Sequence, residues 1–267
     1  MTDARAAAAA APDDAVRVYW MTGCSSCLRT KEFLARHRVP FVSRDVLADP
    51  GAYEELARFG LRQVPIVTRG GAWANGQVLR NVAALAGIAW GAPGALPVPE
   101  LRRRLEAILA GALRLAAQVP EARLEESPPG RPRPHADLIF HIFSIADAFL
   151  EHEAGIPLVF DAYFRVPGPG ARGRAALLGT GADVARRIAA YFDGQGRARD
   201  WTAAAEVYYG RQTVHEFLER TTWHAGQHTR QLAWILDGMG IAPDRPPGPE
   251  VYAGLPMPER VWDGEGP

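Results

Sequence analysis

The feature that most constrains the fold is a change in hydrophobic pattern on either side of one segment rich in proline and glycine, residues 91–99. Before this segment, short runs of β-branched and aromatic residues alternate with stretches of helical spacing, whereas after it the strand patterns nearly disappear. A stretch of this composition with no periodicity is typical of a linker. The chain of 267 residues is long enough for two buried cores, and we expect an α/β domain followed by an all-α domain.

The first region predicts the element order β-α-β-α-β-β-α, which fits one compact α/β domain. Its hairpin turn is expected at Gly70 and Gly71. The expected strands are residues 16–20, a strand beginning at 40, residues 64–67 and a strand around Trp73, and the expected helices are residues 25–37, 50–59 and 78–85.

The second region predicts a four-helix bundle, because four long segments carry apolar residues at helical spacing. The expected helices are residues 100–119, 136–152, 181–192 and 213–239. The predicted domain organisation is a disordered tail at 1–14, the α/β domain at 15–90, a linker at 91–98 and the bundle at 99–267.

Composition excludes several classes of protein. The chain has 30 basic and 30 acidic residues, and this zero net charge disfavours a general nucleic-acid binder, which needs a basic surface. No window approaches the roughly 18 uninterrupted apolar residues of a membrane span. The alanine run near the start is too weakly apolar for a secretion signal. We therefore expect a cytoplasmic protein that binds neither nucleic acid nor membranes.

The two cysteines, Cys24 and Cys27, form a C-x-x-C motif directly after an expected strand and at the start of an expected helix. Unpaired backbone N–H groups and the helix dipole stabilise a thiolate at such a position. We therefore expect Cys24 to attack a disulfide and Cys27 to resolve the mixed disulfide that results. Two other interpretations remain open, a pair of small buried residues and half of a zinc site, although a second pair of cysteines is lacking.

Residues 16 to about 90 resemble a glutaredoxin of the thioredoxin superfamily. The resemblance rests on Val18 and Tyr19 before the cysteine motif, on the segment that begins with Val64 and Pro65, and on the hairpin that follows it. It implies a thioredoxin-like fold, a cis peptide bond at Pro65, and binding of the thiol substrate by the backbone of Val64. It also implies that the partner is a small-molecule thiol or a protein disulfide.

Two departures from the glutaredoxin pattern weaken the expected grip on glutathione. Met21 stands where the family usually has a lysine or arginine, and residues 74–77 replace the Gly-Gly-x-Asp that holds the γ-glutamyl end. The thiol is therefore expected to be glutathione or another low-molecular-weight thiol.

Three histidines form a second candidate site. His224 and His228 are four residues apart, which places both imidazoles on one face of a helix and within reach of a single metal ion. His141 lies in the most apolar expected helix, where a polar side chain usually has a specific bonding partner or function. One histidine from one helix and two from another leave coordination positions open, as in a catalytic metal site. A hydrogen-bonded network of core histidines is the alternative.

The loop at residues 155–174, which contains Tyr163, is expected to line the pocket of this metal. The remaining histidines are expected to be solvated: His37, His135, His152 and His215.

Residues 98 to 263 resemble the DinB/YfiT superfamily of four-helix bundles with a three-histidine metal site. The block at 223–232 and the tail at 254–262 carry this resemblance. It implies that His141, His224 and His228 bind a divalent metal, which can be zinc, nickel, iron or manganese. It also implies chemistry that depends on a low-molecular-weight thiol.

Two functions are compatible with these patterns. The first is an enzyme that combines glutaredoxin-type thiol–disulfide exchange with metal-dependent transfer of a low-molecular-weight thiol, as a thiol S-transferase does. The second is a non-catalytic metal-binding or dimerisation bundle attached to a glutaredoxin-type oxidoreductase. A homodimer is among the assemblies expected.

Overall fold

The computed structural model describes residues 14–91, 94–131 and 133–263. By contacts the chain divides into two compact units, residues 1–21 with 30–91 and residues 22–29 with 92–267. Residues 22–29 connect a strand of the first unit to a helix that ends in it, and they belong to its α/β fold. The first unit is α/β and the second is helical, as the change in hydrophobic pattern predicts.

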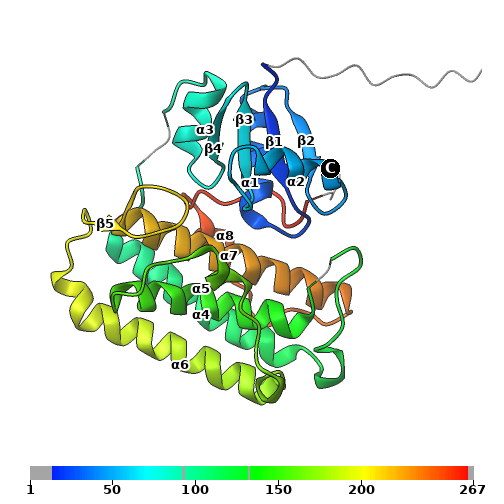
Figure 1. Ribbon diagram of the computed structural model, residues 1–267. Coiled ribbons are helices and arrows are strands. Elements are labelled where there is room, and N and C mark those ends of the chain that lie inside the picture. The colour runs from blue at the N-terminus through cyan, green and yellow to red at the C-terminus, as the bar shows by residue number, and fades with distance from the viewer. Residues whose placement is uncertain (1–13, 92–93, 132, 264–267) are drawn as a thin grey trace, which may run out of the picture. The chain divides into compact units, whose positions relative to one another are not determined.

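The first unit is built on a four-stranded mixed sheet (Figure 1). Its strands are β1 (Arg17–Trp20), β2 (Val42–Asp45), β3 (Ile66–Arg69) and β4 (Ala72–Asn75), and its helices are α1 (Ser25–Arg36), α2 (Pro50–Ala57) and α3 (Leu79–Ala86). The strand order is β2-β1-β3-β4. β1 and β2 run parallel, whereas β3 pairs antiparallel with both β1 and β4.

Successive residues of β1 point to opposite faces of this sheet. Val18 is buried in a core that also contains Phe33 of α1 and Val82 of α3. Tyr19 points to the other face, where its hydroxyl donates a hydrogen bond to Glu55 of α2 at 2.7 Å. α1 and α3 therefore cover one face of the sheet and α2 covers the other, as in a thioredoxin-like fold.

Two strands begin two residues later than predicted. β2 starts at Val42 rather than Pro40, and β3 starts at Ile66 rather than Val64. A proline has no N–H group to donate to a strand ladder, which explains both shifts. The Val64–Pro65 peptide bond is cis, as the resemblance to glutaredoxins implies.

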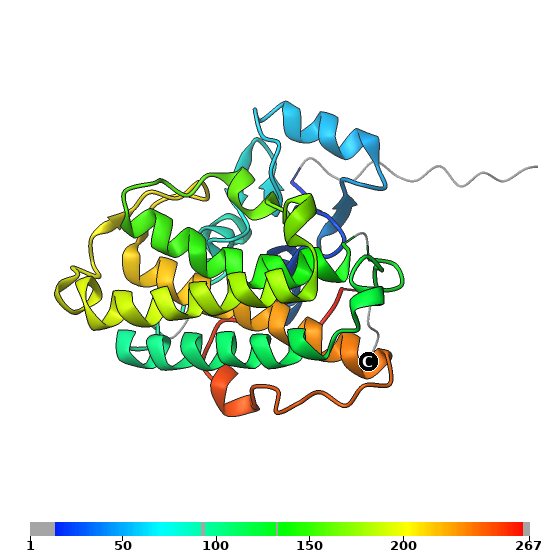
Figure 2. The same cartoon turned by 90° about the horizontal axis from the view of Figure 1, so that it is seen from below.

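The second unit consists mainly of four long helices that lie side by side (Figures 1 and 2). The helices of this unit are α4 (Val98–Gln118), α5 (His135–Glu153), α6 (Arg174–Asp193), α7 (Val214–Gly238) and the short α8 (Pro249–Tyr252). α4 and α5 each pack against both α6 and α7, which closes the bundle. Shorter elements lie between them: η1 (Glu121–Arg123), η2 (Phe160–Phe164), η3 (Pro169–Ala171), η4 (Gln195–Ala198), β5 (Ala204–Ala205) and β6 (Gln212–Thr213).

The start of α6 differs from the prediction. The helix begins at Arg174, about two turns before the predicted start at residue 181. Gly179 and Gly181 lie inside the helix, where glycine is intrinsically unfavourable, and they conceal its first turns in the sequence. A Cβ atom at Gly181 would lie 2.6 Å from the ring of Phe143 on α5. The close approach of the two helices therefore requires glycine at this position and outweighs its low helix propensity.

The last residue of the predicted linker and the last residue of the predicted tail both take part in the folded structure. α4 begins at Val98, inside the predicted linker, because Pro99 occupies the first turn, where proline is tolerated. Asp14, which the prediction placed in the tail, forms an ion pair with Arg69 at 2.9 Å. Residues 1–13 of the predicted tail lie outside the described residues.

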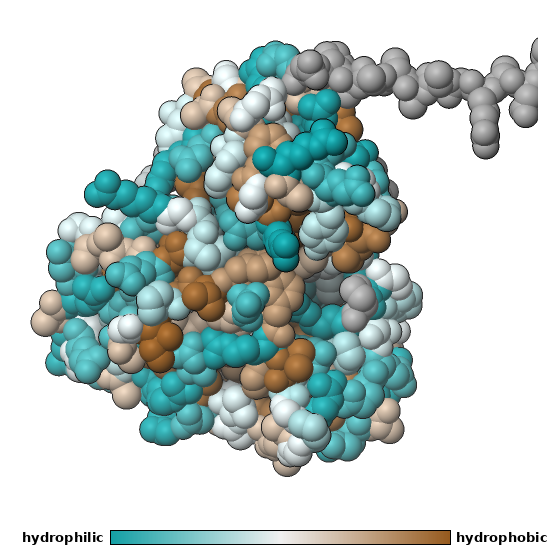
Figure 3. Space-filling view, in the orientation of Figure 1, coloured by the Kyte–Doolittle hydropathy of each residue, from teal (hydrophilic) through white to brown (hydrophobic). Residues whose placement is uncertain are grey.

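Hydrophobic residues are interspersed with hydrophilic ones on the face shown in Figure 3. In the part of the chain that the structure describes, no helix is both long enough and apolar enough to cross a membrane.

Candidate functional site

The cysteine motif lies at the junction between β1 and α1. Cys24 and Cys27 form a disulfide, with their Cα atoms 5.2 Å apart. α1 begins at Ser25, and the backbone N–H of Cys27 points to the Cys24 sulfur at 3.2 Å. Cys27 is fully buried, whereas Cys24 keeps partial exposure. The more exposed sulfur thus receives an N–H group and the dipole of a helix N-terminus, which favour its thiolate in the reduced protein.

Val64 and Pro65 lie at the end of the sheet from which the cysteine motif emerges. Tyr19, near the end of β1, is in register with Ile66, the first residue of β3. Because the two strands are antiparallel, the segment that follows β1 and the segment that precedes β3 leave the sheet at the same edge. The peptide group of Val64 lies outside the registered strand pairs, where an extended ligand could pair with it.

Gly76 holds the cis-proline segment in place. Its N–H donates a hydrogen bond to the Pro65 carbonyl at 2.9 Å, and its own carbonyl accepts one from the Thr30 hydroxyl of α1 at 2.8 Å. A Cβ atom at Gly76 would lie 2.7 Å from the Thr30 hydroxyl and 2.8 Å from Pro65. Only glycine therefore fits between α1 and this segment without a shift of one of them.

The bundle brings together His141 of α5 with His224 and His228 of α7. One ring nitrogen of each histidine lies within 4.8 Å of the others. The Nε2 atoms of His224 and His228 are 3.2 Å apart. Two nitrogens that bind one tetrahedral zinc ion at about 2.0–2.1 Å are themselves about 3.4 Å apart, so this spacing fits a shared metal ion.

Burial keeps the three imidazoles neutral. It lowers the pKa of His141 and His224 well below the ordinary value of 6.5, and that of His228 to about 3. The positive charges of Arg133 and Arg220 lower the pKa of each imidazole further. A neutral imidazole has a lone pair on one ring nitrogen, and this is the form that binds metal ions.

Gln231 fixes the tautomer of His228. Its amide nitrogen donates to the Val261 carbonyl at 3.1 Å, so its amide oxygen is left to accept a hydrogen bond from His228 Nδ1 at 2.6 Å. His228 therefore carries its proton on Nδ1 and its lone pair on Nε2, which points toward His224. Sequence reasoning did not identify this role, although the position three residues after His228 on one helix was a signal for it.

Four of the buried polar atoms that have no hydrogen-bond partner among the residues that the structure describes lie on the triad, on α7 beside it, and on a tyrosine that contacts Arg220. They are Nδ1 of His141, Nδ1 of His224 and the hydroxyls of Thr221 and Tyr209. Thr221 lies three residues before His224, on the same face of α7. Because buried polar groups are nearly always paired, this concentration fits a site for a metal ion and a polar ligand.

An aromatic ring and a buried arginine adjoin the triad. The ring of Tyr163 in η2 lies edge-on to His224 and His141, with ring centres 5.3 and 6.1 Å apart. Its hydroxyl accepts a hydrogen bond from Arg220 at 2.8 Å. Burial raises the pKa of Tyr163 to about 12. Sequence reasoning did not single out Arg220, although it lies one turn before His224 on α7.

Three of the histidines that were expected in solvent have partners instead. The imidazoles of His135 and His215 each contact a backbone carbonyl at 2.7 Å. His152 is buried, accepts a backbone N–H at 3.0 Å and contacts the carboxylate of Glu153 at 3.0 Å. Most of these partners come from other segments of the chain. The position of a histidine on its own helix, from which solvent exposure was predicted, does not reveal such partners. His37 is exposed, as predicted.

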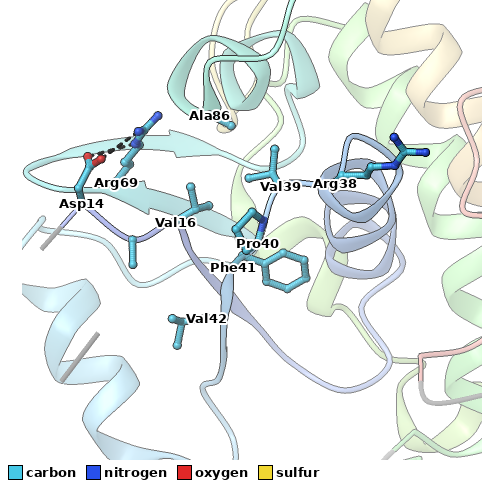
Figure 4. Close-up of a pocket in the computed structure, with 10 residues that line it drawn as sticks. Asp14, Val16, Arg38, Val39, Pro40, Phe41, Val42, Arg69 and Ala86 are labelled. Carbon is cyan, nitrogen blue, oxygen red and sulfur yellow. Dashed lines mark hydrogen bonds and ion pairs between the residues drawn. The ribbon is translucent and has the colours of Figure 1, made fainter. Parts of the chain in front are cut away.

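A cavity of about 470 Å³ lies in the first unit, at the end of the sheet opposite the cysteine motif (Figure 4). Val16 precedes β1, and Phe41 lies between α1 and β2. The ion pair between Asp14 and Arg69 lies at its rim. The lining is mostly apolar and contains neither cysteine.

Comparison with known proteins finds a family match in the N-terminal part of the chain. Residues 16–73 match the family model of the glutaredoxins, which covers the cysteine motif, the cis proline and the sheet as far as β4. No curated protein matches the chain. The N-terminal unit is therefore a glutaredoxin-like domain with a thioredoxin-like fold, and its C-x-x-C pair supports thiol–disulfide chemistry.

Proposed function

We propose that this protein is an enzyme of thiol chemistry, in which the first unit exchanges disulfides and the second uses a metal ion to transfer a low-molecular-weight thiol. The observation that carries the proposal is the group of three buried, neutral imidazoles with their ring nitrogens within 4.8 Å of one another. The four long helices and the block at 223–232 support a DinB/YfiT-like identity for the bundle.

In the first unit, the Cys24 thiolate attacks one sulfur of a substrate disulfide, and the other sulfur leaves as a thiolate. The Cys27 thiolate then attacks the Cys24 sulfur, forms the intramolecular disulfide and releases the second thiolate. Two molecules of glutathione or another low-molecular-weight thiol reduce the pair and leave as their own disulfide. The backbone of Val64, beside Pro65, pairs with the incoming thiol. Because this cycle needs a supply of thiols, we place the protein in the reducing environment of the cytoplasm.

In the second unit, His141, His224 and His228 would hold a divalent cation. Three imidazoles suit zinc, nickel, iron or manganese and leave a coordination position for a substrate. A cation held there would supply Lewis acidity, which lowers the pKa of a thiol ligand. The reaction that this would support is bond formation between the thiol sulfur and an electrophilic carbon, whose leaving group would depart with the bonding electron pair. Gln231 keeps the Nε2 lone pair of His228 available, and the ring of Tyr163 shields one side of the triad.

The test compares the wild-type protein with His224→Ala, both purified without chelators. Metal content is measured by mass spectrometry, and turnover is measured as conjugation of mercaptoethanol or glutathione to chlorodinitrobenzene. We expect about one metal ion per wild-type chain, and loss of both metal and turnover in the variant. His37→Ala, which removes an exposed histidine, serves as the control.

The remaining outcomes discriminate between functions. Stoichiometric metal without thiol-dependent turnover would favour a non-catalytic metal-binding or dimerisation bundle attached to a glutaredoxin-type oxidoreductase. A wild-type protein without metal would contradict the metal site itself.

A further inference from the structure

A group of three buried side chains adjoins the three-histidine cluster. Arg220, Tyr163 and Tyr209 have exposed fractions of 5%, 6% and 3%. The guanidinium carbon of Arg220 lies 4.8 Å from the ring centre of Tyr163 and 4.7 Å from that of Tyr209. Tyr163 also lies against the ring of His224, so the group is in direct contact with the cluster.

The hydroxyls of this group are arranged as donors. A tyrosine hydroxyl keeps its proton at neutral pH. The Tyr163 oxygen accepts a hydrogen bond from Arg220, which leaves its own O–H to donate to another group. The Tyr209 hydroxyl is buried and has no partner within residues 14–91, 94–131 and 133–263. A guanidinium that lies on two tyrosine rings, one of whose hydroxyls is its hydrogen-bond partner and the other unpartnered, matches an acceptor with several lone pairs and a negative charge.

The charges around the cluster favour the same kind of ligand. Among the described residues, the set of potential metal ligands consists of imidazoles, with no carboxylate to offset a cation. Arg133 and Arg220 both exert positive charge on these imidazoles. A divalent cation would add to this positive potential, so a ligand with a negative group besides its thiolate would bind more favourably than a thiol with a neutral tail.

We propose that the thiol that binds at the three-histidine site carries a carboxylate, and that Arg220 binds this carboxylate together with the hydroxyls of Tyr163 and Tyr209. The inference rests on the proposed function of the cluster and adds the substrate class. Arg220 and the two hydroxyls form charge-assisted hydrogen bonds to the carboxylate, while the thiol sulfur lies at the metal. A carboxylate suits a guanidinium, because its two oxygens match the planar fork of N–H donors.

The experiment uses the full chain loaded with cobalt(II), whose thiolate complexes absorb through a sulfur-to-metal charge-transfer band. Mercaptopropionate and its neutral analogue mercaptopropanol are titrated separately, and the band gives the dissociation constant of each. The variants are Arg220→Met and Tyr209→Phe. The control is Arg197→Met, which removes the same charge from an exposed site on the bundle.

We expect Arg220→Met to weaken mercaptopropionate binding about tenfold or more, and Tyr209→Phe to weaken it about fivefold. Mercaptopropanol binding stays the same in both variants, and Arg197→Met leaves both thiols unaffected. If Arg220→Met does not fold, Tyr209→Phe alone decides, because it retains the ring and removes only the hydroxyl.

An unchanged ratio of the two dissociation constants in both variants would overturn the inference, because it would mean that neither Arg220 nor Tyr209 binds the carboxylate. That result leaves the proposed function intact, because both thiols still bind the metal. A protein that binds no cobalt, or whose cobalt binds neither thiol, overturns the proposed function and this inference with it.

Discussion

The cysteine pair and the histidine triad differ in how the chain encodes them. Cys24 and Cys27 lie within one turn of chain at a strand–helix junction, so their chemistry is set locally. His141 and His224 belong to helices far apart in the chain and meet only because α5 packs on α7. The family comparison follows the same division, since it matches residues 16–73 and ends before the bundle. A local motif can be identified from its residues alone, whereas a distributed one depends on packing.

The two sites also differ in how their surroundings prepare them for reaction. At the cysteine pair, a backbone N–H and a helix N-terminus stabilise negative charge on a partly exposed sulfur. At the triad, burial disfavours positive charge and holds the imidazoles neutral. Both environments leave a lone pair available, one on sulfur and one on nitrogen.

The largest expected effect would show that the cysteine pair and the histidine triad act independently. Cys24→Ser removes the nucleophile, and we expect disulfide exchange to fall by about 10³-fold or more, with metal content unchanged. The rate is measured as reduction of a small dialkyl disulfide by a monothiol. Cys27→Ser is the matched control, because it keeps the nucleophile and should accumulate the mixed disulfide. Wild-type exchange in Cys24→Ser would show that the local motif is not the site of this chemistry.

The next prediction tests whether the histidine triad depends on Gln231, which contacts His228 and is not itself one of the three histidines. Gln231→Leu removes the hydrogen bond to His228 Nδ1, and we expect metal affinity to fall by about 10–100-fold. Competition with a chromophoric chelator measures the affinity. Gln227→Leu is the matched control, because Gln227 also donates to the carbonyl of Val261, whereas its hydrogen bonds join it to Val261, Arg260 and Arg230 rather than to a histidine. If both variants lose the same metal affinity, the cause is the lost hydrogen bond to the Val261 carbonyl rather than the one to His228.

Acid should destabilise the metal-free protein through the triad. The pKa of His228 is about 3 in the folded protein and about 6.5 in an unfolded chain. Between these values only the unfolded state binds the proton, so stability is greatest above about pH 6.5 and decreases toward acid. We expect His228 alone to lower the free energy of unfolding by about 2 kcal/mol between about pH 6.5 and pH 5. Urea denaturation of chelator-treated protein measures the loss, and the same loss in His228→Gln would contradict its origin.

The smallest expected effect concerns packing at the local site. Gly76→Ala places a Cβ atom 2.7 Å from the Thr30 hydroxyl, and we expect it to cost at least about 1 kcal/mol of stability. Gly71→Ala is the control, because a Cβ atom there meets no other atom within 4 Å. Thermal denaturation of both variants measures the difference. If the two variants are equally stable, the segment that contains Pro65 is not held by this contact.

Much of the first unit could be predicted because strand and helix periodicities are local. The exceptions also have local causes, since prolines delay the starts of β2 and β3. The bundle was harder to predict. The first turns of α6 were missed because Gly181 is required by the ring of Phe143 on another helix. His135 and His215 were expected in solvent, but backbone carbonyls outside their own helices accept their hydrogen bonds.

The residues alone were enough to establish an α/β unit followed by a helical one, and to identify Cys24 and Cys27 as a candidate redox pair. Hydrophobic period and close spacing are properties of short segments, which explains this success. Only the tertiary structure brought His141 to α7, gave His228 its partner at Gln231 and placed Arg220 between two tyrosines. Burial and hydrogen-bond partners depend on segments far apart in the chain, and no local pattern records them.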